Sequence, residues 1–127
     1  MNLMNIESMA ALLEAHREAD AHPDTRVIVL RSGIDGLFSN GIDPMAVLPA
    51  DTEGRTAVFA ALERLIRGLI SLGKPHIAVI NGPALAGAAV LAVAVDFRYF
   101  EEKAGDYRGG GGAGRVNLNA ETLRRRG

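Results

Sequence analysis

The 127-residue chain has no cysteine and no tryptophan, and aromatic residues make up only 5% of it. Without cysteine, disulfide bonds and thiolate metal sites are excluded. No apolar stretch reaches eighteen residues, so the sequence predicts no membrane-spanning helix. The first twenty residues also contain acidic side chains that a secretory signal lacks, namely Glu7, Glu14, Glu18 and Asp20. We therefore expect a soluble protein that is cytoplasmic by default.

The chain also lacks an excess of either charge. Fourteen basic and fifteen acidic residues leave a net charge of -1, which excludes a nucleic-acid binder that depends on bulk positive charge. Residues 1–97 nevertheless carry seven basic and eleven acidic groups, whereas residues 98–127 carry seven basic and four acidic groups and seven of the fifteen glycines. These compositions predict one modest globular core over residues 1–104 and a flexible Gly/Arg-rich tail over residues 105–127.

Apolar periodicity predicts alternating helices and strands. Apolar residues recur at helical spacing over residues 5–21, where Asn5 can cap the helix. Residues 27–30 are four consecutive apolar residues, a pattern typical of a parallel strand covered on both faces. A helix capped by Asp51 or Thr52 follows and ends near residue 70, and a strand then ends at residue 80. After it come a buried helix, apolar all round, that ends near residue 95, and a short strand that ends at residue 100. This order predicts an α/β protein with helices crossing over between parallel strands.

Two loops, residues 38–43 and 81–88, follow the two clearest strands. Ligands of α/β proteins bind at such carboxyl-end loops. The second loop runs into a helix whose first N–H groups have no partner within the helix, which favours an anion or oxyanion cradle. Alternatively, its small residues serve only to pack the helix closely on the strand. A phosphate-binding loop is excluded because Ala88 and Ala89 stand where lysine and serine or threonine are required.

Other familiar sites find no support in the sequence. Ser39 lies in Phe-Ser-Asn-Gly rather than in a G-x-S-x-G nucleophile elbow. The three histidines, His16, His22 and His76, are scattered along the chain. We expect each of them to be structural or solvated, and no metal site is predicted.

Three ordered motifs point to one family. Residues 38–43 are similar to F-S-x-G-x-D, residues 74–87 to K-P-x-I-A-x-I-N-G-x-A-x-G-G, and residues 96–98 to a D-x-R that ends a buried helix. On these motifs the chain resembles the crotonase superfamily, also called the enoyl-CoA hydratase/isomerase family, over roughly residues 2–102. The resemblance implies a crotonase-like ββα spiral core, incomplete at both ends, and a truncated or degenerate family member.

The same resemblance implies an acyl-CoA site. A thioester carbonyl would lie between the backbone N–H groups of Ile42 and Gly87, which would stabilise an enolate-like oxyanion. Glycine at the second position would let the acyl group approach closely. Ser39, Asn40 and Asp43 would lie along or shape the coenzyme A path. Coenzyme A would be part of the substrate, and no separate cofactor is implied.

Two departures from the family concern the acid and base. The family's hydratases use two glutamates, whose positions are taken here by Val90 and Arg115. An apolar residue at the first position favours an isomerase-like branch. Glu101 and Glu102 are expected on a solvated turn. We therefore expect impaired or absent hydratase activity, since proton transfer contributes about 10² to 10⁴ in rate.

Two alternatives remain open at this point. The chain could be a non-catalytic module that binds acyl-CoA, or one that assembles as a homo-oligomer or with a full-length paralogue. The tail residues 108–115 and 124–126 resemble arginine-glycine segments that bind nucleic acid, but a solvated tail is favoured and no nucleic-acid or membrane partner is expected.

Overall fold

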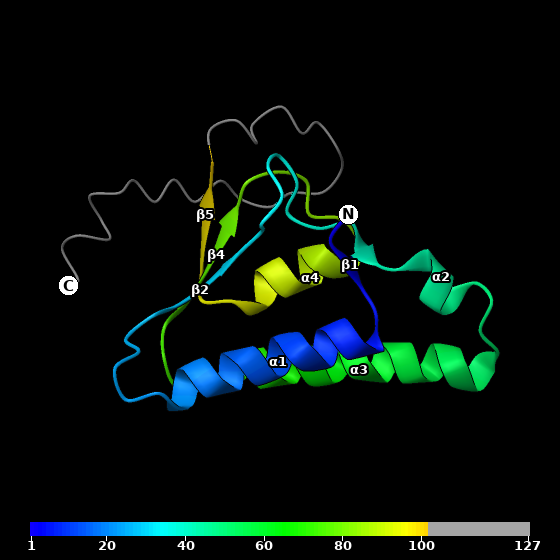
Figure 1. The fold of residues 1–127 in the computed structure, drawn as a ribbon, viewed down its shortest axis with the longest axis horizontal. Helices are drawn as coiled ribbons and strands as arrows, with labels where there is room; N and C mark the ends of the chain where they lie inside the picture. The colour runs from blue at the N-terminus through cyan, green and yellow to red at the C-terminus, as the bar shows by residue number, and fades with distance from the viewer. Residues whose placement is uncertain (102–127) are drawn as a thin grey trace.

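A computed structural model of the protein describes residues 1–101. Its elements follow in the order β1 (Leu3–Met4), α1 (Ile6–Ala21), β2 (Ile28–Arg31), β3 (Gly41–Ile42), α2 (Pro44–Val47), α3 (Thr52–Ile70), β4 (His76–Ile80), α4 (Gly87–Ala94) and β5 (Phe97–Phe100). The α/β class predicted from the sequence is confirmed (Figure 1). The predicted tail, residues 105–127, lies outside the described residues.

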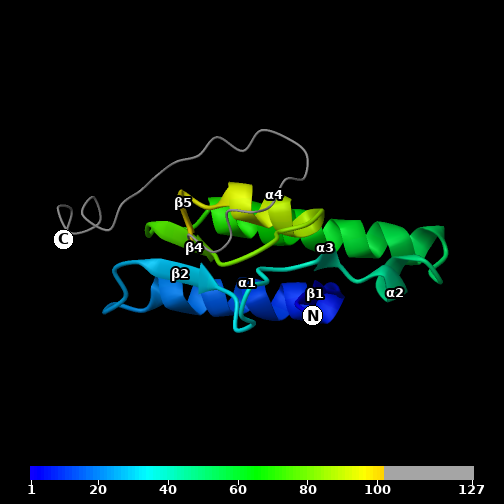
Figure 2. The same cartoon turned by 90° about the horizontal axis from the view of Figure 1, so that it is seen from above.

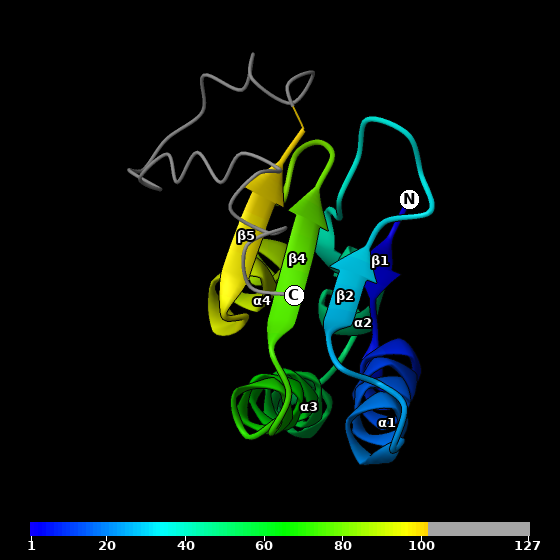
Figure 3. The ribbon, with the colours of Figure 1, turned by 90° about the vertical axis from the view of Figure 1, so that its left-hand side faces the viewer.

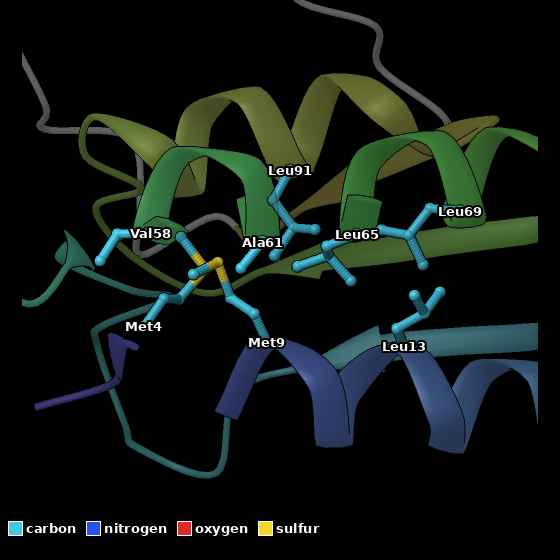
Figure 4. Packing of buried hydrophobic residues seen from close by; sticks show 8 residues of the cluster. All are labelled: Met4, Met9, Leu13, Val58, Ala61, Leu65, Leu69 and Leu91. Carbon is cyan, nitrogen blue, oxygen red and sulfur yellow. The ribbon is translucent and has the colours of Figure 1, made fainter. Parts of the chain in front are cut away.

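The two long helices begin where the sequence predicts. Asn5 caps α1, and its side chain accepts a hydrogen bond from the N–H of Ser8 at 2.8 Å. Asp51 caps α3 in the same way through the N–H of Gly54, also at 2.8 Å. The helices run side by side along the molecule (Figure 2). Their buried faces enclose the larger core cluster, which Figure 4 shows: Met4, Met9, Leu13, Val58, Ala61, Leu65, Leu69 and Leu91.

Strands β2, β4 and β5 form a parallel sheet in the order β2-β4-β5 (Figure 3). The predicted parallel pairing is confirmed, but the prediction that residues 27–30 are covered on both faces is wrong. Ile28 is buried, whereas Val29 is 51% exposed. The physical reason is that the helices pack on one face of β2, and nothing among residues 1–101 covers the other. A continuous apolar run indicates what a strand can bury, and the surroundings decide what it does bury.

Helix α4 differs from expectation for the same reason. Its inner face joins a second core cluster with β4, in which Ala78, Ala88 and Ala92 are buried. Its outer face is open within the described part of the chain, where Val90 is 47% and Val93 70% exposed. The prediction of a helix buried all round is therefore wrong for residues 1–101, although its position after β4 is as predicted.

Short elements that the sequence did not reveal position the first of the two loops, residues 38–43. β1 and β3 pair in parallel over two residues each, and the N–H of Asp43 donates to the carbonyl of Met4 at 2.8 Å. Asp43 also caps the four-residue α2, whose first residue is Pro44. Strands of two residues carry no periodic signal. No helix in the described region is both long and apolar enough to cross a membrane.

Candidate functional site

The two loops that follow β2 and β4 lie against each other. Ser39 and Ala84 form a parallel bridge between them. The N–H of Ser39 donates to the carbonyl of Pro83 at 3.2 Å, and the N–H of Leu85 donates to the carbonyl of Ser39 at 3.0 Å. The loops are thus joined by backbone hydrogen bonds, which fix their relative position independently of side chains.

Ser39 and Asp43 support this arrangement with their side chains. The buried hydroxyl of Ser39 donates to the carbonyl of Asn2 at 2.6 Å and accepts from the N–H of Gly41 at 3.0 Å. Oδ1 of Asp43 accepts from the N–H of Met45 at 2.9 Å. Asn40, between them, is half-buried. Both functional groups bind the protein's own backbone, so Ser39 and Asp43 shape the loop.

Ile42 and Gly87 lie next to each other where the loops meet. Amides alternate in direction along a strand, and the N–H of Asp43 points to β1, so the N–H of Ile42 points away from β1. Gly87 is the first residue of α4, where an N–H has no acceptor within the helix. A Cβ on Gly87 would lie 3.2 Å from Cγ1 of Ile42. The two residues are therefore neighbours on separate loops.

Because Gly87 has no side chain, neighbouring side chains pack against its backbone. A Cβ there would also lie 3.1 Å from Cε of Met4, so its direction is toward the core. We expected glycine at this position to leave room for an approaching acyl group. In the structure it leaves room for the side chains of Met4 and Ile42, because β1 and β3 pack under the start of α4.

The residue before each of these amides has positive φ, at 86° for Gly41 and 46° for Ala86. A non-glycine residue in such a conformation costs on the order of 1 to 3 kcal/mol and is concentrated at functional sites. Sequence reasoning gave neither residue a role. The Asn40-Gly41 pair is a recognisable turn signal, whereas nothing in the local sequence marks Ala86.

Of the two positions where the family's hydratases have glutamates, the one within residues 1–101 has no carboxylate. Val90 lies three residues after Gly87 on α4 and is half exposed. Glu101 is exposed beyond the end of β5, as predicted, and its N–H donates to the carbonyl of Ile80 at 3.1 Å. Glu102 and Arg115 lie outside the described residues. No group of three or more potential metal ligands occurs within residues 1–101.

Comparisons with known proteins give one result. The model of a family described as enoyl-CoA hydratase/isomerase matches residues 1–108. The (E)-benzylidenesuccinyl-CoA hydratase of Thauera aromatica is 36% identical over 98 residues, which cover 77% of this chain and 38% of that protein. An enoyl-CoA hydratase of Mycobacterium tuberculosis is 32% identical over 108 residues, which cover 81% of this chain and 40% of that protein.

A solved structure agrees with the sequence relatives. The enoyl-CoA hydratase from Bacillus halodurans is similar with a TM-score of 0.69 at 26% identity, over 76% of this chain and 40% of that one. The chain thus spans about two fifths of the length of the relatives that it matches.

Proposed function

The chain belongs to the enoyl-CoA hydratase/isomerase family and has part of the crotonase fold, and on that premise we propose that it binds an acyl-CoA thioester through the N–H groups of Ile42 and Gly87. The observation that supports the proposal is the close approach of residues Ile42 and Gly87, each preceded by a residue with positive φ. Coenzyme A enters as part of the substrate, with no separate cofactor.

In the proposed complex, the two N–H groups donate to the thioester oxygen. Removing an α-proton, or adding water to the double bond, moves negative charge onto that oxygen. Fixed donors aimed at the developing charge stabilise the transition state without having to reorganise. The start of α4 adds the positive end of its dipole next to Gly87.

The acid and base half of the site differs from that of a hydratase. The side chain of Val90 carries no proton to transfer, and the same position favours an isomerase-like reaction. With Arg115 at the second position, both expected glutamates are absent. We propose that turnover of enoyl-CoA is impaired or absent, because a positioned acid or base contributes about 10² to 10⁴ in rate.

A non-catalytic binding or assembly module is the second candidate. Apolar side chains are exposed on the open sheet face and on the outer face of α4, including Val29, Val93 and Phe100. Apolar surface of this kind is typical of association between chains, here with another copy or a full-length paralogue. Sedimentation of the purified chain distinguishes the two states, since a stable monomer over the micromolar range would contradict the assembly role.

Replacement of Ile42 by proline tests the oxyanion site. Proline removes the N–H, and the β1–β3 hydrogen bonds survive because that N–H does not point to β1. Ile42→Val keeps the N–H and serves as the matched control. Calorimetry gives the affinity for butanoyl-CoA and for free coenzyme A, and infrared spectroscopy gives the carbonyl stretch of the bound thioester.

We expect Ile42→Pro to weaken butanoyl-CoA binding by up to about tenfold, as one lost hydrogen bond implies. Its bound carbonyl stretch should move to higher frequency, with the affinity for free coenzyme A unchanged. Ile42→Val should behave like the wild type. Unchanged affinity and an unchanged carbonyl stretch in a folded Ile42→Pro protein would refute the proposal.

A further inference from the structure

At Gly41 the loop after β2 lies close against the backbone before α4. A Cβ on Gly41 would lie 2.6 Å from the carbonyl oxygen of Leu85, 3.1 Å from the nitrogen of Gly87 and 3.3 Å from Cβ of Ala86. The two nearest atoms belong to the backbone, so no side-chain rotation could relieve the overlap. Any residue other than glycine would have to displace the chain before α4.

A second glycine in the same connection separates the conformational requirement from the steric one. Gly36 also has positive φ, at 70°, but a Cβ there would meet nothing within 4 Å. The two glycines therefore share the conformational requirement, and only Gly41 adds a steric one. Gly36 provides a natural control for the backbone strain that a side chain causes at positive φ.

The Gly41 contact connects both amides of the site. Gly41 is bonded to Ile42, so its conformation sets the direction of the Ile42 N–H. Its open side faces the nitrogen of Gly87. The hydroxyl of Ser39 accepts a hydrogen bond from the N–H of Gly41 at 3.0 Å and so fixes the position of the glycine.

We propose that Gly41 is the positioning residue of the oxyanion site: its missing side chain lets the Leu85–Gly87 backbone lie against β3, which sets the spacing and direction of the Ile42 and Gly87 N–H groups. This inference rests on the proposed function, because it assigns Gly41 a role in that site. A side chain at position 41 would move the two donors apart, so that one thioester oxygen could no longer accept from both.

The experiment compares Gly41→Ala with Gly36→Ala. Both variants should lose thermal stability, because alanine is strained at positive φ. Only Gly41→Ala should lose the preference for butanoyl-CoA over free coenzyme A, by about tenfold, as expected for one lost hydrogen bond. Its bound carbonyl stretch should also rise in frequency. Wild-type affinity in Gly41→Ala, or an equal loss in Gly36→Ala, would overturn the inference.

Nuclear magnetic resonance separates this inference from the proposed function. In the free wild-type protein, an α-proton of Gly41 should show a nuclear Overhauser effect to the amide proton of Gly87. Gly41→Ala should shift the amide resonances of Ile42 and Gly87, and Gly36→Ala should leave them in place. A wild-type protein that does not bind butanoyl-CoA would refute the proposed acyl-CoA function alone. Absence of the Overhauser effect would refute the Gly41 contact, whether or not Gly41→Ala folds.

Discussion

The imidazole rings of His16 and His76 meet edge to face in the interior, with their Nε2 atoms 3.1 Å apart. Nδ1 of His16 lies 2.7 Å from the carbonyl oxygen of Leu12, which can only accept, so Nδ1 carries the proton. Nε2 of neutral His16 must then accept from the Nε2–H of His76. This arrangement leaves Nδ1 of His76 buried without a partner among the described residues.

This histidine pair predicts a loss of stability in mild acid. Burial, and to a smaller extent repulsion from His16, lower the pKa of His76 from 6.5 to about 4 against the opposing effect of Asp96. Between these two pH values the unfolded chain binds a proton that the folded chain does not, so stability falls as the pH decreases. The expected loss from pH 6.5 to pH 4 is roughly 3 kcal/mol. Denaturant unfolding at several pH values measures it.

His76→Phe should remove most of this pH dependence, because no ring then needs to stay neutral at position 76. His22 is exposed and supplies the control. His22→Ala should keep the full dependence. An equal pH dependence in wild type and His76→Phe would contradict the assignment, since the carboxyl groups common to both would then account for it.

Val90→Glu should introduce a proton-transfer group next to the proposed oxyanion site. Val90 is half exposed, so a glutamate is accommodated without burial. We expect hydration or isomerisation of crotonyl-CoA to increase by about 10²-fold, the lower end for one acid or base. Val93→Glu, on the same helix and more exposed, should leave the rate unchanged. Equal rates in the two variants would place the reacting carbons away from position 90.

Asp20→Ala should weaken the attachment of α1 to the loop before β4. The Asp20 carboxylate accepts from the N–H groups of Gly73 and Lys74, with Oδ1 at 3.0 Å from each nitrogen. Two amides lose a partner in the variant, and we expect a loss of about 1 to 3 kcal/mol in the free energy of unfolding. Asp24→Ala, at an exposed position on the following turn, should change it by less than about 0.5 kcal/mol. Urea denaturation measures both.

Ala86→Gly should stabilise the fold. Glycine adopts positive φ freely, so the variant should gain about 1 kcal/mol in the free energy of unfolding. Ala92→Gly, at a buried position inside α4, should lose at least the same amount. A loss of stability in Ala86→Gly would show that the backbone at position 86 is not strained. Thermal denaturation of the two variants provides the comparison.

Local signals in the sequence located most elements. The Asn5 and Asp51 caps and the apolar spacing behind them define α1 and α3, because capping and helical periodicity depend on residues within one or two turns. β1 and β3 were not predicted, because a strand of two residues is too short to show an alternation of apolar and polar residues. The open faces of β2 and α4 were not predicted either, because an apolar residue in the sequence does not indicate which elements pack against it.

The sequence by itself determined the α/β class, the family and the two loops that carry its motifs, since these are read from residue types in order. Only the tertiary structure brought residues Ile42 and Gly87 together, placed Gly41 against the backbone before α4 and joined His16 to His76. Those contacts link residues far apart in the chain and depend on how strands and helices pack. Positive φ at Ala86 arises in the same way, because the packed loops impose a conformation that alanine does not prefer.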